Sequence, residues 1–303
     1  MRVLFSAGLG MPALLRMVPL AQALLAAGHE VRFCCPARAR HRVARAGLVP
    51  VLATPSQFSR AWRPELVVHD PLCPDSTTMA AESGAPTVGY LPYAHPPLPP
   101  RPTVWIDDCP PPLRERPRPD AWAVRCDAYE LPGEAPRWLA GPPLRPRVCV
   151  VGDAAYGSTP EDRQRAELFR RAAEGADSLG LELLVLAGRD QPWSRLLPGC
   201  AAVVHAGDEG TVYAAARFGV PQLVLPAGEA ERRVAERIER VGIGRCLAEE
   251  EMAGDPSALR LRFHVAELVH GGRALPTATA LSRTVAELTP PGDLVPRLEA
   301  LVR

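Results

Sequence analysis

Short apolar runs alternate with longer stretches of helical spacing along the N-terminal part of the chain. The runs predict buried strands at residues 3–6, 29–35, 66–69 and 87–91. The stretches between them predict helices at residues 14–27, 40–46 and 76–83. Parallel strands need crossover connections of this kind. The pattern therefore predicts a doubly wound α/β domain.

The middle of the chain is rich in proline. Residues 92–146 hold 16 of the 35 prolines, which excludes regular helix there. We expect an extended Pro-rich linker at residues 101–146, between an N-terminal domain at 1–100 and a C-terminal domain at 147–303. The C-terminal domain repeats the alternation, with strands expected at residues 147–151, 182–187, 201–204 and 222–225 and helices at 159–179, 211–218, 230–241, 256–270 and 278–288.

Composition is that of a globular protein, with 47% hydrophobic and 23% charged residues. The net charge of +1 gives no field that would attract nucleic acid. No apolar stretch approaches the roughly 18 residues of a membrane span and no signal-peptide pattern is visible, so we expect a cytoplasmic protein. The eight cysteines form no C-x-x-C pair and no histidine has metal-ligand spacing, so neither a metal site nor a disulfide framework is expected.

Both halves of the chain carry longer motifs. These are MRVLFSAG, VPLAQALLAAGHEVRF, ELVVHDPLCPD, AAESGAPTVGY, WIDDCPPPLR, PRVCVV, CAAVVHAGDEGT and AARFGVPQLVLP. Together they resemble the GT-B glycosyltransferases that decorate bacterial natural products with activated sugars. The resemblance implies two Rossmann-like domains facing across a cleft, the GT-B arrangement, with an abbreviated N-terminal domain and a last helix that returns to it. It also implies that the function lies in the cleft.

The catalytic base of that family has no counterpart in this sequence. In the family a His after the first strand removes the acceptor proton, and this chain has Ala13 at that position. Arg16 is the only ionisable residue at 8–18, and a guanidinium cannot act as a base near neutral pH. Asp70 matches the family Asp that orients the missing His. Asp70 and His95 are therefore the catalytic candidates, as acids or bases acting on their own.

The loop that holds the donor phosphate in the family matches in two ways. An ungapped alignment puts the family His on Ala206 and a glycine on Asp208. An alignment with one inserted residue instead matches His205, Gly207, Gly210 and Thr211. Both alignments stay open. In either alignment the carboxylates of Asp208 and Glu209 lie where the family binds the donor diphosphate. Repulsion between these negative charges disfavours a nucleoside diphosphate.

The rest of the donor side also departs from the family. Ala230 and Glu231 replace the Asp-Gln pair that holds the sugar hydroxyls, and length is missing at residues 95–104 and 187–196. The side chains expected to line the cleft are Met11, Tyr93, Asp153, Tyr156, Glu229 and Glu231.

These departures predict a glycosyltransferase-like protein that has lost transfer from a nucleotide sugar and needs no cofactor. Its cleft would bind a small natural-product intermediate, either for donor-free acid/base tailoring chemistry or to help a partner enzyme. The alternative is an active inverting transferase, with a UDP- or TDP-sugar as co-substrate and a hydrophobic aglycone as acceptor. A third alternative is an interaction protein. Whether the chain is an enzyme, and whether it forms a homodimer, stays open.

Overall fold

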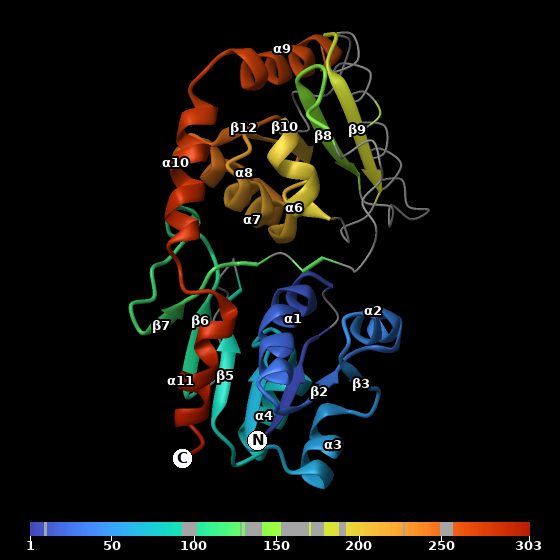
Figure 1. The fold of residues 1–303 in the computed structure, drawn as a ribbon, viewed down its shortest axis with the longest axis vertical. Coiled ribbons are helices and arrows are strands. Elements are labelled where there is room, and N and C mark those ends of the chain that lie inside the picture. Colours follow the sequence, from blue (N-terminus) through green and yellow to red (C-terminus); the bar gives the residue numbers. More distant parts are fainter. Residues whose placement is uncertain are drawn as a thin grey trace. The chain divides into compact units, whose positions relative to one another are not determined.

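The chain folds into two compact α/β units in a computed structural model (Figure 1). One unit consists of Met1–Pro132 together with Glu287–Arg303, and the other of Gly133–Ala286. The structure describes residues 1–8, 11–92, 102–127, 129–130, 141–152, 170, 179–187, 192–226, 228–248 and 257–303. Each unit is built on one parallel sheet, as the sequence predicts.

The first unit holds a seven-stranded parallel sheet in the order β3-β2-β1-β4-β5-β6-β7. Its strands are β1 (Arg2–Ser6), β2 (Glu30–Cys34), β3 (Val49–Val51), β4 (Leu66–His69), β5 (Thr87–Tyr90), β6 (Val104–Asp107) and β7 (Ala121–Ala123). The connecting helices are α1 (Met11–Ala26), α2 (Arg40–Arg45), α3 (Pro55–Trp62) and α4 (Pro74–Glu82). The strand order reverses beside β1, which is typical of a doubly wound sheet.

Alternate side chains of the central strands bury both faces of this sheet. In β1, Val3 and Phe5 pack in one cluster with residues of α1, whereas Leu4 packs on the other face with Met79 of α4. The rings of Phe5 and Phe33 stack with their centroids 5.4 Å apart. Because helices cover both faces, the middle of the strand, residues 3–5, is apolar on both sides, and this explains the continuous apolar run in the sequence.

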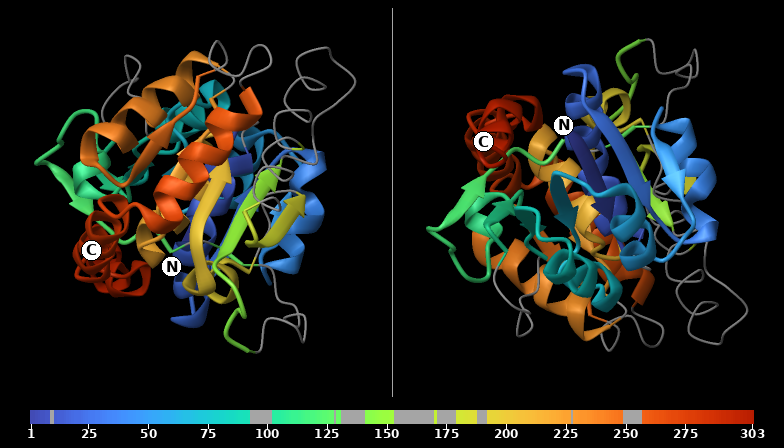
Figure 2. Two further views of the ribbon diagram at one scale, coloured as in Figure 1. Left: turned by 90° about the horizontal axis from the view of Figure 1, so that it is seen from above. Right: turned by 90° about the horizontal axis from the view of Figure 1, so that it is seen from below.

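The last residues of the chain belong to the first unit, as the resemblance implies. A short 3₁₀ helix (Pro291–Leu294) and α11 (Val295–Ala300) lie beside α1, and the red C-terminal end is near the blue N-terminus (Figures 1 and 2). Leu294 and Leu298 are fully buried in the cluster that also holds the apolar face of α1. The second unit therefore does not include the final segment of the domain expected at residues 147–303.

The expectation of an extended linker at residues 101–146 is wrong for the part that contains residues 104–107 and 121–123. Val104–Asp107 and Ala121–Ala123 are the strands β6 and β7, paired in the first sheet. Neither strand contains a proline, and the neighbouring prolines lie in the connections. Dense proline excludes helix over the region, but it interrupts a strand only at the proline positions themselves.

The second unit holds a five-stranded parallel sheet in the order β12-β11-β10-β8-β9. Its strands are β8 (Arg147–Gly152), β9 (Glu182–Ala187), β10 (Cys200–His205), β11 (Gln222–Val224) and β12 (Gly244–Cys246). Its helices are α6 (Trp193–Leu196), α7 (Glu209–Phe218), α8 (Glu229–Val241), α9 (Ser257–His270) and α10 (Ala274–Ala286). Nearly all of the helix expected at 159–179 lies outside the described residues. None of the helices in the described part of the chain is long and apolar enough to cross a membrane.

We expect Leu298→Ala to destabilise the first unit by about 2–5 kcal/mol, because a fully buried leucine is removed and a cavity remains. Hydrogen exchange should quicken at β1 and β2 and stay unchanged at β10. Leu275→Ala is the control, since Leu275 is 50% exposed on α10. Unchanged protection of β1 in Leu298→Ala would show that the C-terminal helix does not stabilise this unit.

Candidate functional site

His205 ends β10, the central strand of the second sheet, and is fully buried. Its Nδ1 accepts a hydrogen bond from the N–H of Gly207 at 3.0 Å, and its Nε2 lies 3.0 Å from Oε1 of Gln222 on β11. The ring is therefore neutral with its proton on Nε2. Burial lowers the pKa of His205, against the opposing effects of Asp208 and the Gln222 hydrogen bond. Both ring nitrogens are thus bound within the second unit.

Asp208 caps the helix that follows this loop. It precedes α7 with extended backbone, and its Oδ1 accepts a hydrogen bond from the N–H of Thr211 at 3.1 Å. Its carbonyl accepts from the N–H of Val212 at 3.0 Å. The first amides of a helix lack acceptors within the helix, and a carboxylate there is also favoured by the helix dipole. The Asp208 carboxylate therefore takes a place where an external anion would otherwise bind.

Gly207 brings the loop against helix α8. Its φ of +98° lies in the left-handed region that favours glycine. A Cβ at Gly207 would lie 3.1 Å from Cγ1 of Val224 and 3.2 Å from Cβ of Glu231, in the first turn of α8. Glycine is therefore required here, and Glu231 is a neighbour of the loop. Glu229 is exposed instead, with Oε1 3.8 Å from Nε of Arg233.

The hydroxyl of Thr211 is buried and has no hydrogen-bond partner among the described residues. Thr211 itself is 1% exposed at the start of α7. A buried hydroxyl without a partner lowers stability, and a ligand oxygen placed there would remove that cost. Thr211 is thus the side chain of this loop that is best suited to an additional hydrogen bond.

Asp70 follows β4 at the carboxyl edge of the first sheet and is 8% exposed. Its N–H donates to the carbonyl of Ser6 at 2.9 Å, and its Oδ1 accepts from the N–H of Leu72 at 2.9 Å. A Cβ at Gly8 would lie 3.4 Å from its Oδ2 and 2.8 Å from Cβ of Cys73. The carboxylate therefore lies beside the loop after β1, and glycine at position 8 leaves room for it.

His69, the residue before Asp70, is a core residue and is 2% exposed. Because side chains alternate along a strand, His69 lies on the same face of the sheet as Val67, which packs with Met79 of α4. Among the described residues its Nδ1 has no hydrogen-bond partner. Burial lowers the pKa of His69 to about 4, although the backbone and the charge of Asp70 act in the opposite direction. His69 is therefore neutral at neutral pH.

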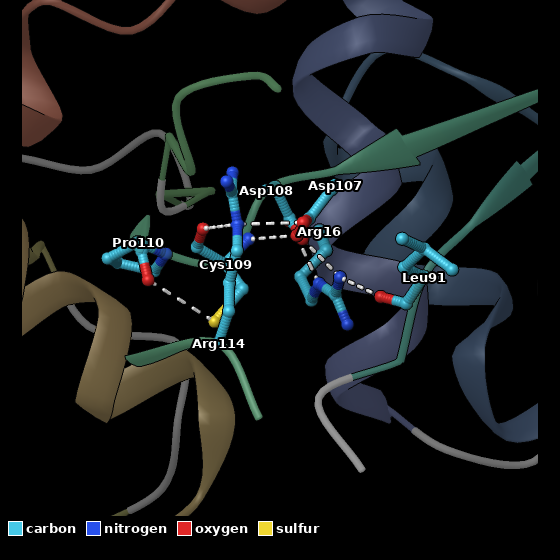
Figure 3. Close-up of polar contacts among 7 residues, drawn as sticks. All are labelled: Arg16, Leu91, Asp107, Asp108, Cys109, Pro110 and Arg114. Atoms are coloured by element: carbon cyan, nitrogen blue, oxygen red, sulfur yellow. Dashed lines mark hydrogen bonds and ion pairs between the residues drawn. The ribbon is translucent and has the colours of Figure 1, made fainter. Parts of the chain in front are cut away.

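Arg16 forms a buried ion pair at the same sheet edge (Figure 3). Its Nε donates to Oδ2 of Asp108 at 2.9 Å, and its Nη2 donates to Oδ1 of Asp108 and, at 2.7 Å, to the carbonyl of Leu91. Next to it, Nε of Arg114 lies 2.7 Å from Oδ2 of Asp107. Burial raises the pKa of Asp107, against the effect of Arg114. Neither pair was predicted, and the sequence signal for the first is that Arg16 is a single arginine within an apolar helix.

The structure brings the predicted donor-side residues together and leaves other candidates unplaced. The residues 205–211 form one turn from β10 into α7, and Glu231 adjoins it. Asp70 belongs to the first unit. Met11 is the first residue of α1. Four candidates lie outside the described residues, namely Tyr93, His95, Asp153 and Tyr156.

Two parallel Rossmann-like sheets, with a glycine loop and a capped helix after the central strand of the second, define the class of GT-B glycosyltransferases. Residues 187–301 match the family described as erythromycin biosynthesis protein CIII-like, C-terminal domain. The chain is 30% identical to the L-demethylnoviosyl transferase of Streptomyces niveus over 322 aligned positions, which cover 80% of this chain and 84% of that protein. The chain belongs to the GT-B glycosyltransferases of bacterial antibiotic biosynthesis.

Solved structures share the whole fold. Spinosyn forosaminyltransferase SpnP matches with a TM-score of 0.81 at 26% identity, covering 100% of this chain and 99% of that chain. Spinosyn rhamnosyltransferase SpnG complexed with thymidine diphosphate matches with a TM-score of 0.84 at 24% identity, covering 99% and 100%. The 322 positions aligned with the Streptomyces niveus relative exceed the 303 residues of this chain, so that relative has segments that this chain lacks. These comparisons favour an active transferase over the loss of transfer expected from the sequence.

We expect the stability of the protein to fall between pH 6.5 and pH 4 in part because of His69. Its unfolded pKa is about 6.5, and its folded pKa is about 4, so acid protonates the unfolded chain first and favours unfolding. The effect of His69 between pH 7 and pH 5 is about 2 kcal/mol. Urea unfolding of the wild type and His69→Leu at both pH values measures it. An equal loss in both proteins would contradict this assignment.

Proposed function

We propose that this protein is an inverting glycosyltransferase that transfers a sugar from a TDP- or UDP-sugar to a hydroxyl of a small hydrophobic aglycone. The observation that carries the proposal is the turn from β10 into α7, where a glycine loop meets a helix start. The buried Thr211 hydroxyl there has no hydrogen-bond partner among the described residues. The relatives support it, because the Streptomyces niveus protein is named as a sugar transferase and SpnG is described with bound thymidine diphosphate.

The donor diphosphate would bind at the start of α7. Helix N-termini attract phosphate through their free amides and their dipole. The Thr211 hydroxyl would donate one further hydrogen bond to a phosphate oxygen. His205 would act indirectly, because its ring holds the N–H of Gly207 and the side chain of Gln222, and these bonds keep the loop in shape. The Asp208 carboxylate is the group that opposes the diphosphate.

Asp70 would act as the base on the acceptor side. In an inverting transfer the acceptor hydroxyl loses its proton as its oxygen bonds to the anomeric carbon, and the nucleoside diphosphate leaves from the opposite face of the sugar. The N–H of Leu72 holds Oδ1 of Asp70, while Oδ2 has no hydrogen bond within the described part of the chain. Oδ2 is therefore the oxygen suited to take the proton, in place of the histidine that position 13 lacks.

A second candidate function is binding of a natural-product intermediate without any nucleotide sugar. One observation favours it: the Thr211 amide, a donor that a diphosphate would use, is bound by Asp208. Calorimetric titration with TDP and with UDP decides between the two functions. A transferase binds at least one of them, and a ligand at 100 times its dissociation constant adds about 2.7 kcal/mol of stability. Absence of binding for both nucleotides would support the second candidate.

We expect Asp208→Asn to bind TDP at least about tenfold more tightly than the wild type, because a carboxylate is removed from the diphosphate position while asparagine caps a helix equally well. The melting temperature without ligand should fall only slightly, because the cap is kept and only the attraction between the carboxylate and the helix dipole is lost. Glu209→Gln, which removes the neighbouring charge without touching the cap, is the matched comparison. Equal TDP affinity in wild type and Asp208→Asn would show that this carboxylate does not oppose the donor.

We expect Asp70→Asn to lower kcat about 10²-fold or more, since a positioned general base contributes roughly 10²–10⁴ to the rate. Turnover is measured with a TDP-sugar and a panel of polycyclic phenols, by mass spectrometry of the glycosylated product. The dissociation constant of TDP should not change, because Asp70 lies on the first unit and the proposed phosphate loop on the second. Undiminished turnover in Asp70→Asn would remove Asp70 from the chemistry.

A further inference from the structure

A pocket of about 330 Å³ opens between helices α3 and α4 of the first unit. Its wall includes the C-terminal part of α3, the end of α4 and the residues that lead into β4. The pocket therefore lies at the amino ends of the strands, whereas Asp70 follows the carboxyl end of β4. It is separate from the proposed reaction site and has a volume within the usual range for small-molecule pockets.

Two polar side chains of this pocket have no partner in the part of the chain that the structure describes. Ser59 is 5% exposed and lines the pocket, and no hydrogen bond of its hydroxyl is found there. The Arg63 side chain is exposed, and within the described part of the chain its guanidinium forms neither a hydrogen bond nor an ion pair. Glu65, the nearest acid along the chain, is bound by Arg2 instead, with Oε2 accepting the Arg2 N–H at 2.7 Å. A buried serine and an exposed arginine that no described carboxylate neutralises thus line the same pocket.

The backbone of Arg63 is also unusual. Arg63 ends α3 with φ 51° and ψ 71°, and it is the one non-glycine residue with positive φ among the described residues. Glycine normally takes this position after a helix, because a Cβ disfavours the left-handed region. An arginine at this position therefore has the conformational cost of the left-handed region, which a glycine would avoid. Strained backbone of this kind is concentrated at ligand sites, which points to a binding role for the Arg63 side chain.

The charges of the wall indicate the class of ligand. Arg60 is paired with Glu82, with Nη2 2.9 Å from Oε2, so Arg63 leaves one net positive charge. This balance suits a monoanion better than a phosphate dianion, and the guanidinium fork matches a carboxylate. Met79 and Pro64, both buried, supply an apolar wall. We propose that this pocket binds a small carboxylic acid, with its carboxylate on Arg63, a polar atom on Ser59 and its apolar body against Met79 and Pro64.

The test is a titration of the full chain with benzoate, followed by the ¹³C-methyl signal of Met79, which Met79→Leu assigns among the five methionines. Benzyl alcohol is the uncharged probe of the same shape, and inorganic phosphate is the dianionic probe. We expect a saturable shift of Met79 with benzoate and none with the other two. A shift with phosphate alone, or no saturable shift with any probe, would overturn the proposal.

Arg63→Gly is the decisive variant. Glycine suits the backbone at this position, so the variant should fold with an unchanged or higher melting temperature, while benzoate binding weakens at least tenfold. Arg40→Gln, which removes an exposed arginine outside the pocket, is the matched control and should bind as the wild type does. Equal benzoate affinity in Arg63→Gly and wild type would contradict the role of Arg63. The readout is independent of sugar transfer.

Discussion

All strands of both sheets run parallel, and this constraint determines where chemistry can occur in each unit. Parallel strands need crossovers, so the carboxyl ends of all strands in a sheet meet at one edge. Asp70 follows β4 at that edge of the first sheet, and Asp108 follows β6 there. The turn from His205 to Thr211 leaves the corresponding edge of the second sheet. Within each sheet, residues far apart in sequence therefore lie at the same edge.

Polar groups at these edges are bound mainly by the protein itself. His205 binds a loop amide and Gln222, Asp208 caps α7, and Arg16 joins Asp108 to the carbonyl of Leu91. Burial makes such bonds necessary, since a buried polar group without a partner is costly. The same bonds reduce the number of groups available to substrates. Oδ2 of Asp70 and the hydroxyl of Thr211 stand out because no bond to either is found among the described residues.

The sequence predicted most buried strands and long helices, because continuous apolar runs and helical spacing are local signals, but it missed β6 and β7 among the prolines. It missed β3, α3 and β12, which are short elements. β3 also contains Pro50 at the sheet edge, where a missing amide is tolerated. The cap formed by Asp208 follows a local rule and could have been predicted. The hydrogen bond between His205 and Gln222 could not have been predicted, because it depends on the register between β10 and β11, which the sequence alone does not give.

The buried pair of Arg16 and Asp108 connects two strand ends of the first sheet in a chain that is shorter than its Streptomyces niveus relative. The chain lacks segments of that relative, yet the first sheet is complete from β3 to β7. The guanidinium of Arg16 reaches the carbonyl after β5 and the carboxylate after β6, so it joins two strand ends across a short connection. Losing one partner of a buried ion pair is far more costly than losing an exposed one. Arg16, held in a buried pair with Asp108, therefore joins the ends of β5 and β6 at the sheet edge where Asp70 follows β4.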